Sequence, residues 1–177
     1  MKKAILVTGV TGSGKSVVSE YLNNLGYEAY DIEEIEGMFA MYRKDTKEVF
    51  EGYENTPEKI KNADWICDVG KLKELLNKQK SDLAFYCGVA SNMDDIIPLF
   101  DKMILLKADS ETIMKRLASR EGTDKMGATE ESREMVLDWK DWWESEIEKK
   151  GAIVIDANGS VEDVTRRILD IVNNQTN

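Results

Sequence analysis

The stretch Gly9-Val10-Thr11-Gly12-Ser13-Gly14-Lys15-Ser16 decides the fold, because it matches the pattern G-x-x-x-x-G-K-[ST]. It follows an apolar run, residues 3–8, that is typical of a buried strand, and it opens a helical pattern that stops at Gly26. Glycines let backbone N–H groups turn toward phosphate oxygens, and the helix start adds its positive dipole end. The sequence therefore predicts a loop that binds a nucleoside triphosphate.

The motif also predicts a role for individual loop residues. Lys15 is expected to reach the terminal phosphates and to act in catalysis by neutralising their charge. Ser16 is expected to ligate magnesium through its hydroxyl. In and directly after the loop, the residues predicted to bind the nucleotide are Gly9, Thr11, Gly12, Ser13, Gly14, Lys15, Ser16 and Val17.

Outward from the loop, short apolar runs alternate with helical patterns along the whole chain. Further strands are predicted at residues 27–31, 83–87, 102–106 and 152–155, and a last helix after Ser160. Five buried strands joined by helices indicate an α/β fold, a three-layer sandwich with a five-stranded parallel sheet covered on both faces. No linker divides the chain, so residues 1–177 are predicted to form a single domain.

Composition narrows the classes of function. The 177 residues include 24 basic and 34 acidic side chains, a formal charge of −10, and no Lys/Arg-rich run. We therefore expect no nucleic-acid partner, since a polyanion would be repelled. The chain has no histidine, which excludes histidine bases, Ser-His triads and His-ligated zinc.

Two further features bear on location. Cys67 and Cys87 each lie in an apolar stretch, which favours two buried thiols in a reducing compartment. The apolar run near the N-terminus is too short for a signal peptide or a membrane span. We expect a soluble cytoplasmic protein with no membrane partner.

With these features the chain resembles the adenylate kinase and shikimate kinase group of P-loop phosphotransferases. The likeness covers most of the chain and is specific mainly in the loop. It implies ATP and Mg²⁺ as cofactors, and transfer of the terminal phosphate to a small-molecule acceptor such as a nucleoside, a nucleotide or a small alcohol. A monomer and a homodimer are both compatible with the sequence.

In this group, acidic residues at the end of the second strand lie beside the magnesium, and Asp31-Ile32-Glu33-Glu34 occupies that place here. The adenylate kinases also end a third strand in Asp-Gly, where this chain has Cys87-Gly88 and lacks the acid. Asp31 is therefore the candidate for metal binding and for accepting a proton, with Glu33 as second choice. Alternatively, or in addition, Asp31 caps the following helix.

Residues 109–120 are similar to the helix that leads into the mobile lid of these kinases, which makes Arg116 and Arg120 candidate catalytic phosphate clamps. At 100° per residue, Arg120 falls within about 20° of Ile113 and Arg116 within about 60°, on the apolar side of the helix. A guanidinium there needs an anionic partner, either the phosphate or a carboxylate in a structural ion pair.

The lid itself is predicted at residues 120–133, with Gly122 and Gly127 as hinges. Lys125 and Arg133 are weaker candidates for reaching the phosphates from it. The turn after the last strand, residues 156–160, looks like the loop that touches the adenine base in this group. Asn158 is its candidate residue, and a capped helix start is the alternative reading.

Residues 32–82 correspond to the helical insert that covers the acceptor in this group. Arg43 is the only arginine in it, which argues against an acceptor carrying a phosphate. Trp65 near Asp68 could hold a ring against a carboxylate; the alternative is a core tryptophan and a helix cap. Trp139, Trp142 and Trp143 are spaced as a packing face on a helix over residues 133–149.

A second function stays open beside the kinase. The missing acid before Gly88 favours a regulatory ATP- or GTP-binding module that changes conformation and transfers phosphate slowly or only to water. The two functions differ in whether an acceptor stimulates ADP production.

Overall fold

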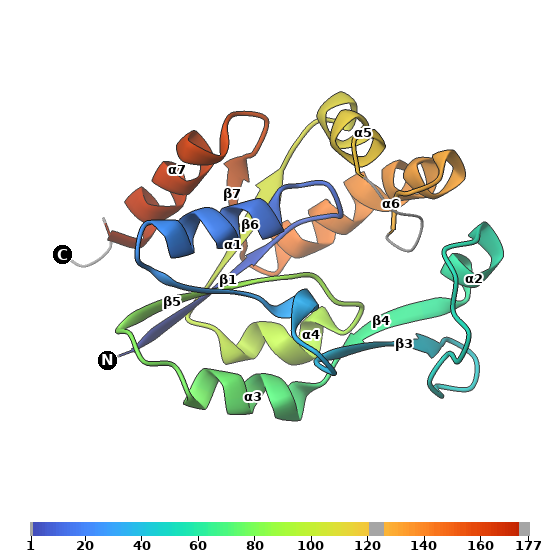
Figure 1. Ribbon diagram of the computed structural model, residues 1–177, viewed down its shortest axis with the longest axis horizontal. Coiled ribbons are helices and arrows are strands. Elements are labelled where there is room, and N and C mark those ends of the chain that lie inside the picture. The colour runs from blue at the N-terminus through green and yellow to red at the C-terminus, as the bar shows by residue number, and fades with distance from the viewer. Residues whose placement is uncertain (1, 121–125, 174–177) are drawn as a thin grey trace.

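A computed structural model describes residues 2–120 and 126–173, and its centre is a five-stranded parallel sheet in the order β2-β5-β1-β6-β7. The phosphate loop follows β1, the central strand (Figure 1). The strands of this sheet are β1 (Lys3–Thr8), β2 (Glu28–Asp31), β5 (Leu83–Cys87), β6 (Lys102–Lys107) and β7 (Ile153–Asp156). The predicted parallel sheet is confirmed.

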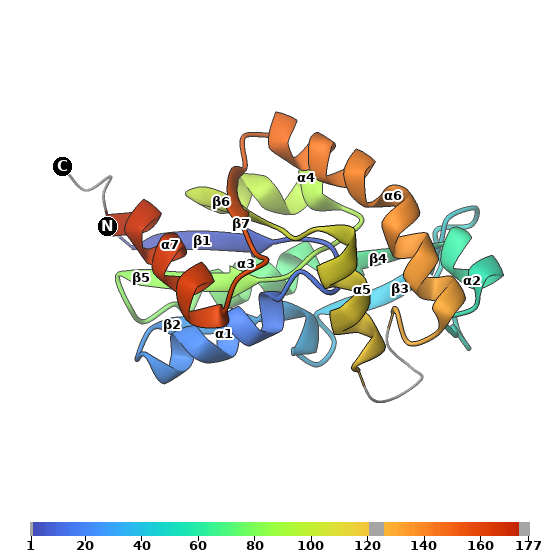
Figure 2. The ribbon, with the colours of Figure 1, turned by 90° about the horizontal axis from the view of Figure 1, so that it is seen from above.

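Helices cover both faces of the sheet, which makes the three layers that the sequence predicts. Helices α1 and α7 lie on one face, and α3 and α4 lie on the other (Figures 1 and 2). The bounds are α1 (Lys15–Asn24), α3 (Val69–Asn77), α4 (Met93–Ile96), α5 (Ser110–Ala118), α6 (Glu130–Lys149) and α7 (Val161–Asn173), with the 3₁₀ turns η1 (Ile32–Glu34) and η2 (Ile97–Leu99).

Strand β1 explains why an unbroken apolar run predicts the middle of such a sheet. Ile5 and Val7 pack into the core under α1 and α7, whereas Leu6 points into the core under α3 and α4. All three side chains are fully buried. A strand covered on both faces has no position where a polar side chain could reach water.

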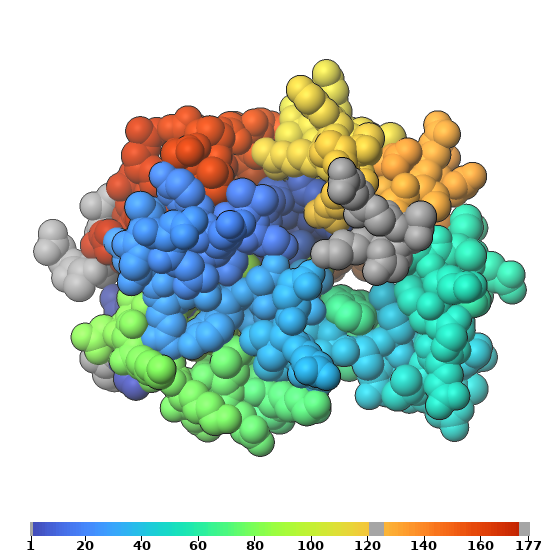
Figure 3. Space-filling model, in the orientation of Figure 1, coloured from blue at the N-terminus to red at the C-terminus, as the bar shows by residue number. Residues whose placement is uncertain are grey.

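The insert departs from the helical form expected for it. Strand β3 (Phe39–Arg43) pairs antiparallel with β4 (Ala63–Cys67), and besides the 3₁₀ turn η1 the helices within this region are α2 (Pro57–Lys61) and α3. The runs Phe-Ala-Met-Tyr-Arg and Ala-Asp-Trp-Ile-Cys are rich in residues that favour strands, and they contact each other across the hairpin. We call residues 39–67 the hairpin segment; it projects beside the start of α6 (Figure 3).

The start of helix α6 also differs from the one expected. Helix α6 begins at Glu130 because Thr129 and Ser132 form a reciprocal capping box, so the predicted lid, residues 120–133, ends inside a helix. Its residues 121–125, which include Gly122 and Lys125, lie outside the described residues. Of the three tryptophans predicted to form a packing face on this helix, Trp139 and Trp143 pack against the hydrophobic cores, but Trp142 is 66% exposed.

Other local predictions hold. Asp68 caps α3 by accepting a hydrogen bond from the Lys71 N–H, and Ser160 accepts one from the Asp163 N–H at the start of α7. Cys67 and Cys87 are free and buried. Within the described ranges, we find no helix with the length and apolar character that a membrane span needs.

Candidate functional site

The phosphate loop presents the start of α1 as an anion site. Gly14 caps this helix in the left-handed conformation, with φ of 104°, and it makes no side-chain capping bond. The first turn contains no acidic residue. No side chain of the first turn therefore competes with a bound anion for the backbone N–H groups and the positive end of the helix dipole.

Gly9 fixes the base of the loop. A Cβ atom at this position would lie 2.4 Å from Ser13 Oγ and 2.7 Å from the backbone oxygen of Leu106. Ser13 itself is buried, and its hydroxyl has no hydrogen-bond partner among the described residues. The loop is thus packed directly against β6, with no room for a side chain at Gly9.

Lys15 is the cation of the loop and is 8% exposed. Its Nζ donates to the carbonyl oxygens of Gly9 at 2.9 Å and Val10 at 3.4 Å, and lies 3.6 Å from Glu33 Oε1. Ser16, in contrast, is exposed at the surface of the loop. The motif lysine therefore lies inside the loop beside a carboxylate that belongs to another part of the chain.

That carboxylate, Glu33, joins three segments at the edge of the sheet. Besides its contact with Lys15, Oε1 accepts a hydrogen bond from the Val89 N–H at 3.1 Å. Its Oε2 accepts one from the Trp65 indole N–H, also at 3.1 Å. The Cγ atom lies 3.3 Å from where a Cβ on Gly88 would be. Glu33 therefore approaches, from the β2 side, the place beside Gly88 where the related kinases are expected to carry an acid.

Asp31 has a different position. Its Oδ1 accepts a hydrogen bond from the Glu33 N–H at 3.2 Å and caps η1, as the alternative reading of this residue expected. In β2 it pairs with Cys87 of β5. Because η1 turns the chain directly after Asp31, Glu33 and not Asp31 reaches Lys15. The metal and proton-accepting roles predicted for Asp31 stay predictions.

Cys87 does not supply the missing acid. Burial, together with the nearby charge of Asp31, raises the pKa of its thiol to about 12. The thiol is therefore protonated at neutral pH and is not a thiolate ligand. The oxygen donors near this edge are the carboxylates of Asp31 and Glu33 and the hydroxyl of Ser16.

These donors fit magnesium held together with a nucleotide. No group of three or more His, Cys, Asp or Glu side chains able to hold a metal occurs among residues 2–120 and 126–173. Magnesium at phosphate sites uses one or two carboxylates plus substrate oxygens and water, and needs no cage made only of protein. A hydroxyl and one or two carboxylates beside the loop suit that mode.

Arg116 ties the loop to the opposite end of the site. Its Nη1 donates to the carbonyl oxygens of Gly12 at 3.4 Å and Ser13 at 3.2 Å, and its Nη2 donates to Ala157 O at 2.8 Å. The partners required by a guanidinium on the apolar side of α5 are thus carbonyl oxygens. Arg116 fixes the phosphate loop relative to the turn after β7, and its phosphate role stays a prediction.

Arg120 lies just beyond the helix on which the angular projection was based. Helix α5 ends at Ala118, so the projection does not apply two residues later. Its Nη1 nevertheless donates to Thr11 Oγ1 at 3.1 Å, and its side chain is exposed beside the loop. Arg133 turns elsewhere: its Nη1 donates to the carbonyl oxygens of Gly127 and Ala128.

Asn158 lies in the predicted turn after β7, and both atoms of its side-chain amide form hydrogen bonds within the protein. The amide oxygen accepts from the Asp109 N–H at 2.9 Å, and the amide nitrogen donates to Asp156 Oδ1 at 2.8 Å. These bonds connect the starts of α5 and α7. The contact with an adenine base stays a prediction for this residue.

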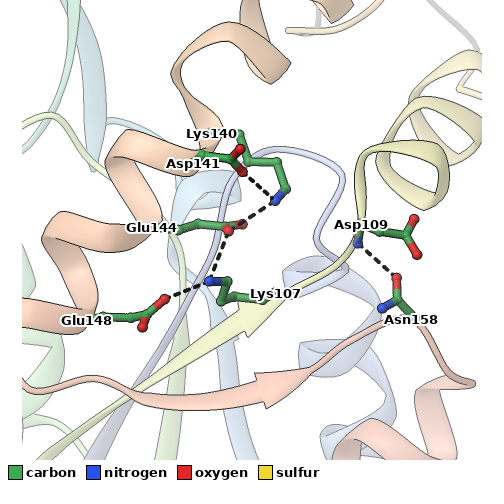
Figure 4. A network of polar contacts seen from close by, with 7 residues as sticks. All are labelled: Lys107, Asp109, Lys140, Asp141, Glu144, Glu148 and Asn158. Atoms are coloured by element: carbon green, nitrogen blue, oxygen red, sulfur yellow. Dashed lines mark hydrogen bonds and ion pairs between the residues drawn. The ribbon is translucent and has the colours of Figure 1, made fainter.

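A hollow of about 460 Å³ lies next to this turn, on the α6 side of β6 and β7. Beneath it, the buried Glu144 Oε2 lies 3.1 Å from Lys140 Nζ and 3.6 Å from Lys107 Nζ, and Lys107 also contacts Glu148 (Figure 4). Each lysine is neutralised by a carboxylate, so this cluster fastens α6 to β6 and offers no excess positive charge to a phosphate.

Sequence reasoning missed the link between Glu33 and Trp65. The two residues are 32 positions apart, and only the hairpin brings the indole to the carboxylate. The pattern of residues 39–43 and 63–67 was the available signal, because aromatic and apolar residues cluster there in two short runs separated by a turn-rich stretch. Trp65 is half-buried and stacks on Phe39, with ring centroids 5.0 Å apart.

Comparisons with known proteins agree with this architecture. Residues 5–138 match a protein family described as an AAA domain. A dephospho-CoA kinase of Fusobacterium nucleatum is 25% identical, over 93% of this chain and 96% of that protein.

Two solved structures share the fold. The first, a shikimate kinase from Acinetobacter baumannii in complex with shikimate, has a TM-score of 0.63 and 21% identity, covering 100% of this chain and 97% of that one. The second, a deoxyadenosine kinase from M. mycoides with bound dATP, has a TM-score of 0.57 and 18% identity, covering 97% and 99%. The chain therefore belongs to the AAA-domain family of P-loop proteins, and its structural neighbours are small-molecule kinases.

Proposed function

We propose that this protein is a kinase that transfers the terminal phosphate of ATP to a hydroxyl of a small-molecule acceptor. The observation that carries the proposal is the 3.6 Å contact between Lys15 Nζ and Glu33 Oε1. A cation suited to phosphate and a carboxylate suited to a hydroxyl proton lie side by side at the mouth of an anion-binding loop. The similarity to several kinases supports the same reaction.

The loop would hold the triphosphate through its backbone N–H groups and Lys15. In binding, Lys15 Nζ exchanges its bonds to the Gly9 and Val10 carbonyl oxygens for phosphate oxygens. Arg120, which already lies beside Thr11, is positioned to add a second cation. Arg116 would hold the loop in register with the turn at Ala157, and residues from that turn, with Asn158, would border the base.

Transfer is a balanced exchange of one bond for another. The acceptor oxygen forms a bond to the γ-phosphorus while the bond from that phosphorus to the bridging oxygen of ADP breaks, and ADP keeps the electron pair. The acceptor proton passes to Glu33 and from there to water. Mg²⁺, when bound, would be held by Ser16 and Asp31 and would neutralise phosphate charge.

The acceptor insert and the lid expected from the resemblance each have a role in the proposal. Residues 32–82 would bind the acceptor, since Glu33 and Trp65 both belong to this region and contact each other. Residues 120–133 would close over the phosphates and exclude water. A soluble enzyme acting on a small molecule is consistent with these parts.

An acceptor screen tests the proposal. The full chain is incubated with MgATP and candidate acceptors, namely nucleosides, nucleotides, sugars and small alcohols. ADP release is measured over time, and the phosphorylated acceptor is detected separately. At least one acceptor should raise ADP release well above the background without acceptor. Lys15→Met should lower that stimulated rate by about 10²- to 10³-fold, since it removes the main charge on the transferred group.

Lys149→Met is the matched control, because Lys149 is exposed on α6 and pairs only locally with Glu146 in the described contacts. Its rate should equal that of the unaltered protein. If no acceptor raises ADP release, the kinase proposal is wrong. The neutral thiol of Cys87 in place of an acid would then favour a regulatory nucleotide-binding module.

A further inference from the structure

The hairpin segment carries an aromatic platform on the side that faces the phosphate loop. Phe39 and Trp65 lie on the same face of the hairpin, because Phe39 pairs with Cys67 and Met41 pairs with Trp65. Their rings stack with centroids 5.0 Å apart and planes 22° apart. The Trp65 indole reaches Glu33, which in turn contacts Lys15, so this face adjoins the place of phosphate transfer.

The platform is held in position by polar contacts at its edge. The Trp65 backbone N–H donates to Ser91 Oγ at 2.9 Å, and its carbonyl oxygen accepts from the Ser91 N–H at 2.7 Å. Asn92 holds the neighbouring Cys67 backbone in the same way, through both amide atoms. Since the indole N–H is already bound to Glu33 and one ring face is stacked on Phe39, Trp65 offers a ligand its other ring face.

The surrounding charge disfavours an acceptor that carries a phosphate. Residues 32–68 contain ten acidic and five basic side chains, a net charge of −5. The single arginine, Arg43, is stacked over the Phe50 ring, with Cζ 4.0 Å from the ring centroid. Lys44, Lys47 and Lys59 are bound to Lys61 O, Asp64 and Glu54. These contacts therefore do not form an anion-binding site.

We infer that the acceptor is an uncharged molecule with a planar ring, such as a nucleoside, whose ring packs on the Phe39–Trp65 platform. This inference rests on the proposed kinase function and narrows its acceptor. The ring binds through apolar contact and stacking, and the hydroxyl attached to it meets Glu33. A monophosphate of the same compound would bring its negative charge beside Glu33 and into an acidic region.

The chemistry of transfer suits this arrangement. The hydroxyl oxygen of the ring compound bonds to the γ-phosphorus, the phosphorus–oxygen bond to ADP breaks, and the hydroxyl proton leaves through Glu33. Trp65, by holding Glu33 Oε2, leaves Oε1 as the oxygen that faces Lys15. Trp65 is therefore both part of the acceptor surface and a positioning residue for the carboxylate.

The experiment compares matched acceptors on the full chain. Adenosine, cytidine and thymidine are each tested against their own monophosphates and against ribose, which has hydroxyls but no planar ring. The nucleoside should be used with at least about 10-fold higher kcat/KM than both comparators, a difference near 1.4 kcal/mol. ATP hydrolysis without acceptor is measured in parallel.

Variants then test the platform itself. Trp65→Ala should raise the KM for the nucleoside about 10-fold or more, while the Kd for ATP changes less than about 2-fold. Trp65→Phe keeps a ring and should recover most of the affinity, but it loses the bond to Glu33 and should lower kcat. Trp142→Ala, on the exposed tryptophan of α6, is the matched control and should change neither constant.

The outcomes distinguish failure of the inference about the acceptor from failure of the proposed kinase function. Turnover that favours monophosphates or ring-free sugars overturns the inference and leaves the kinase function standing. The same holds if Trp65→Ala leaves the nucleoside KM unchanged. If Trp65→Ala fails to fold, Trp65→Phe and Phe39→Leu decide the question through their KM values. Absence of turnover with every acceptor overturns both the inference and the kinase function.

Discussion

The phosphate loop and the hairpin segment line the same candidate site, but they are held in opposite ways. The loop is packed into the centre of the main sheet, with Gly9 against Leu106 and Lys15 buried. The hairpin shares no strand pairing with that sheet and is anchored by Glu33, Ser91 and Asn92 at one end. The difference indicates a rigid nucleotide half and a more loosely held acceptor half.

The largest effect is expected at the base of the loop. Gly9→Ala would place a methyl group 2.7 Å from the Leu106 carbonyl oxygen, a backbone atom that cannot move aside alone. We expect the free energy of unfolding to fall by about 2–3 kcal/mol and ATP binding to be lost. Urea unfolding and ATP titration measure both quantities.

Gly159→Ala is the matched control, because its added Cβ would meet only ordinary contacts with Asp163. It should change the free energy of unfolding by less than about 0.5 kcal/mol. A Gly9→Ala protein with unchanged stability and ATP affinity would contradict the view of the loop as the rigid half.

The next effect is expected at the carboxylate between the two halves. Glu33→Gln keeps the size of the side chain and an oxygen for the indole, but removes the charge and the proton acceptor. The stimulated rate should fall about 10²-fold while ATP affinity stays within a few-fold of the original. Asp31→Asn is the comparison, and a larger loss there would return the proton-accepting role to Asp31.

Substitutions of Arg116 and Arg120 should distinguish a structural role from a role in phosphate transfer. Arg116→Ala removes the hydrogen-bond donors to three carbonyl oxygens. It should lower the free energy of unfolding by about 1–3 kcal/mol and should also weaken ATP binding. Arg120→Ala removes a single bond to Thr11 and should slow transfer about 10-fold at nearly constant stability. Equal losses of stability in both variants would contradict this division.

The smallest effect is expected where the chain returns from residues 32–82 to the sheet. Burial opposes the charge of Glu28, but hydrogen bonds from the Ser81 N–H, the Tyr30 hydroxyl and the Lys80 N–H outweigh it and lower the pKa of Glu28 to about 2. A carboxylate with a depressed folded-state pKa stabilises the fold above its unfolded value of 4.5, and this contribution is lost as the pH falls toward 2.

Glu28→Gln should therefore lower the free energy of unfolding by about 1 kcal/mol or less at neutral pH, after allowance for solvent screening. The difference should shrink as the pH falls from 4.5 through about 2. Urea unfolding across this acid range measures the difference. Glu20→Gln, an exposed acid on α1, is the control. A variant whose stability follows the same pH dependence as the original would show that the bonds of Glu28 do not matter.

The main sheet was predictable because its signals are local. Each expected strand agrees with the structure to within one residue at either end, since fully buried strands are short apolar runs between polar turns. The phosphate loop was equally predictable, because its residues are contiguous and its geometry requires glycine at fixed positions.

The acceptor side was less predictable because its contacts join distant residues. The paired residues of the two hairpin strands lie 20 to 28 positions apart in the sequence, and the strand propensities are too weak to decide between strand and helix without that partner. Glu33 was placed second to Asp31 because the turn of η1 that brings it to Lys15 leaves no sequence pattern of its own. Arg120 was assigned to a helix that ends before it.

The separate hairpin also has a consequence for how such proteins diversify. Because β3 and β4 pair with each other and not with the main sheet within the described chain, their side chains can be exchanged without disturbing the register of that sheet. A lineage could thus keep its nucleotide machinery intact while altering what it phosphorylates. Selection on this protein would act first on residues 39–67, and the record of its past acceptors should be sought there.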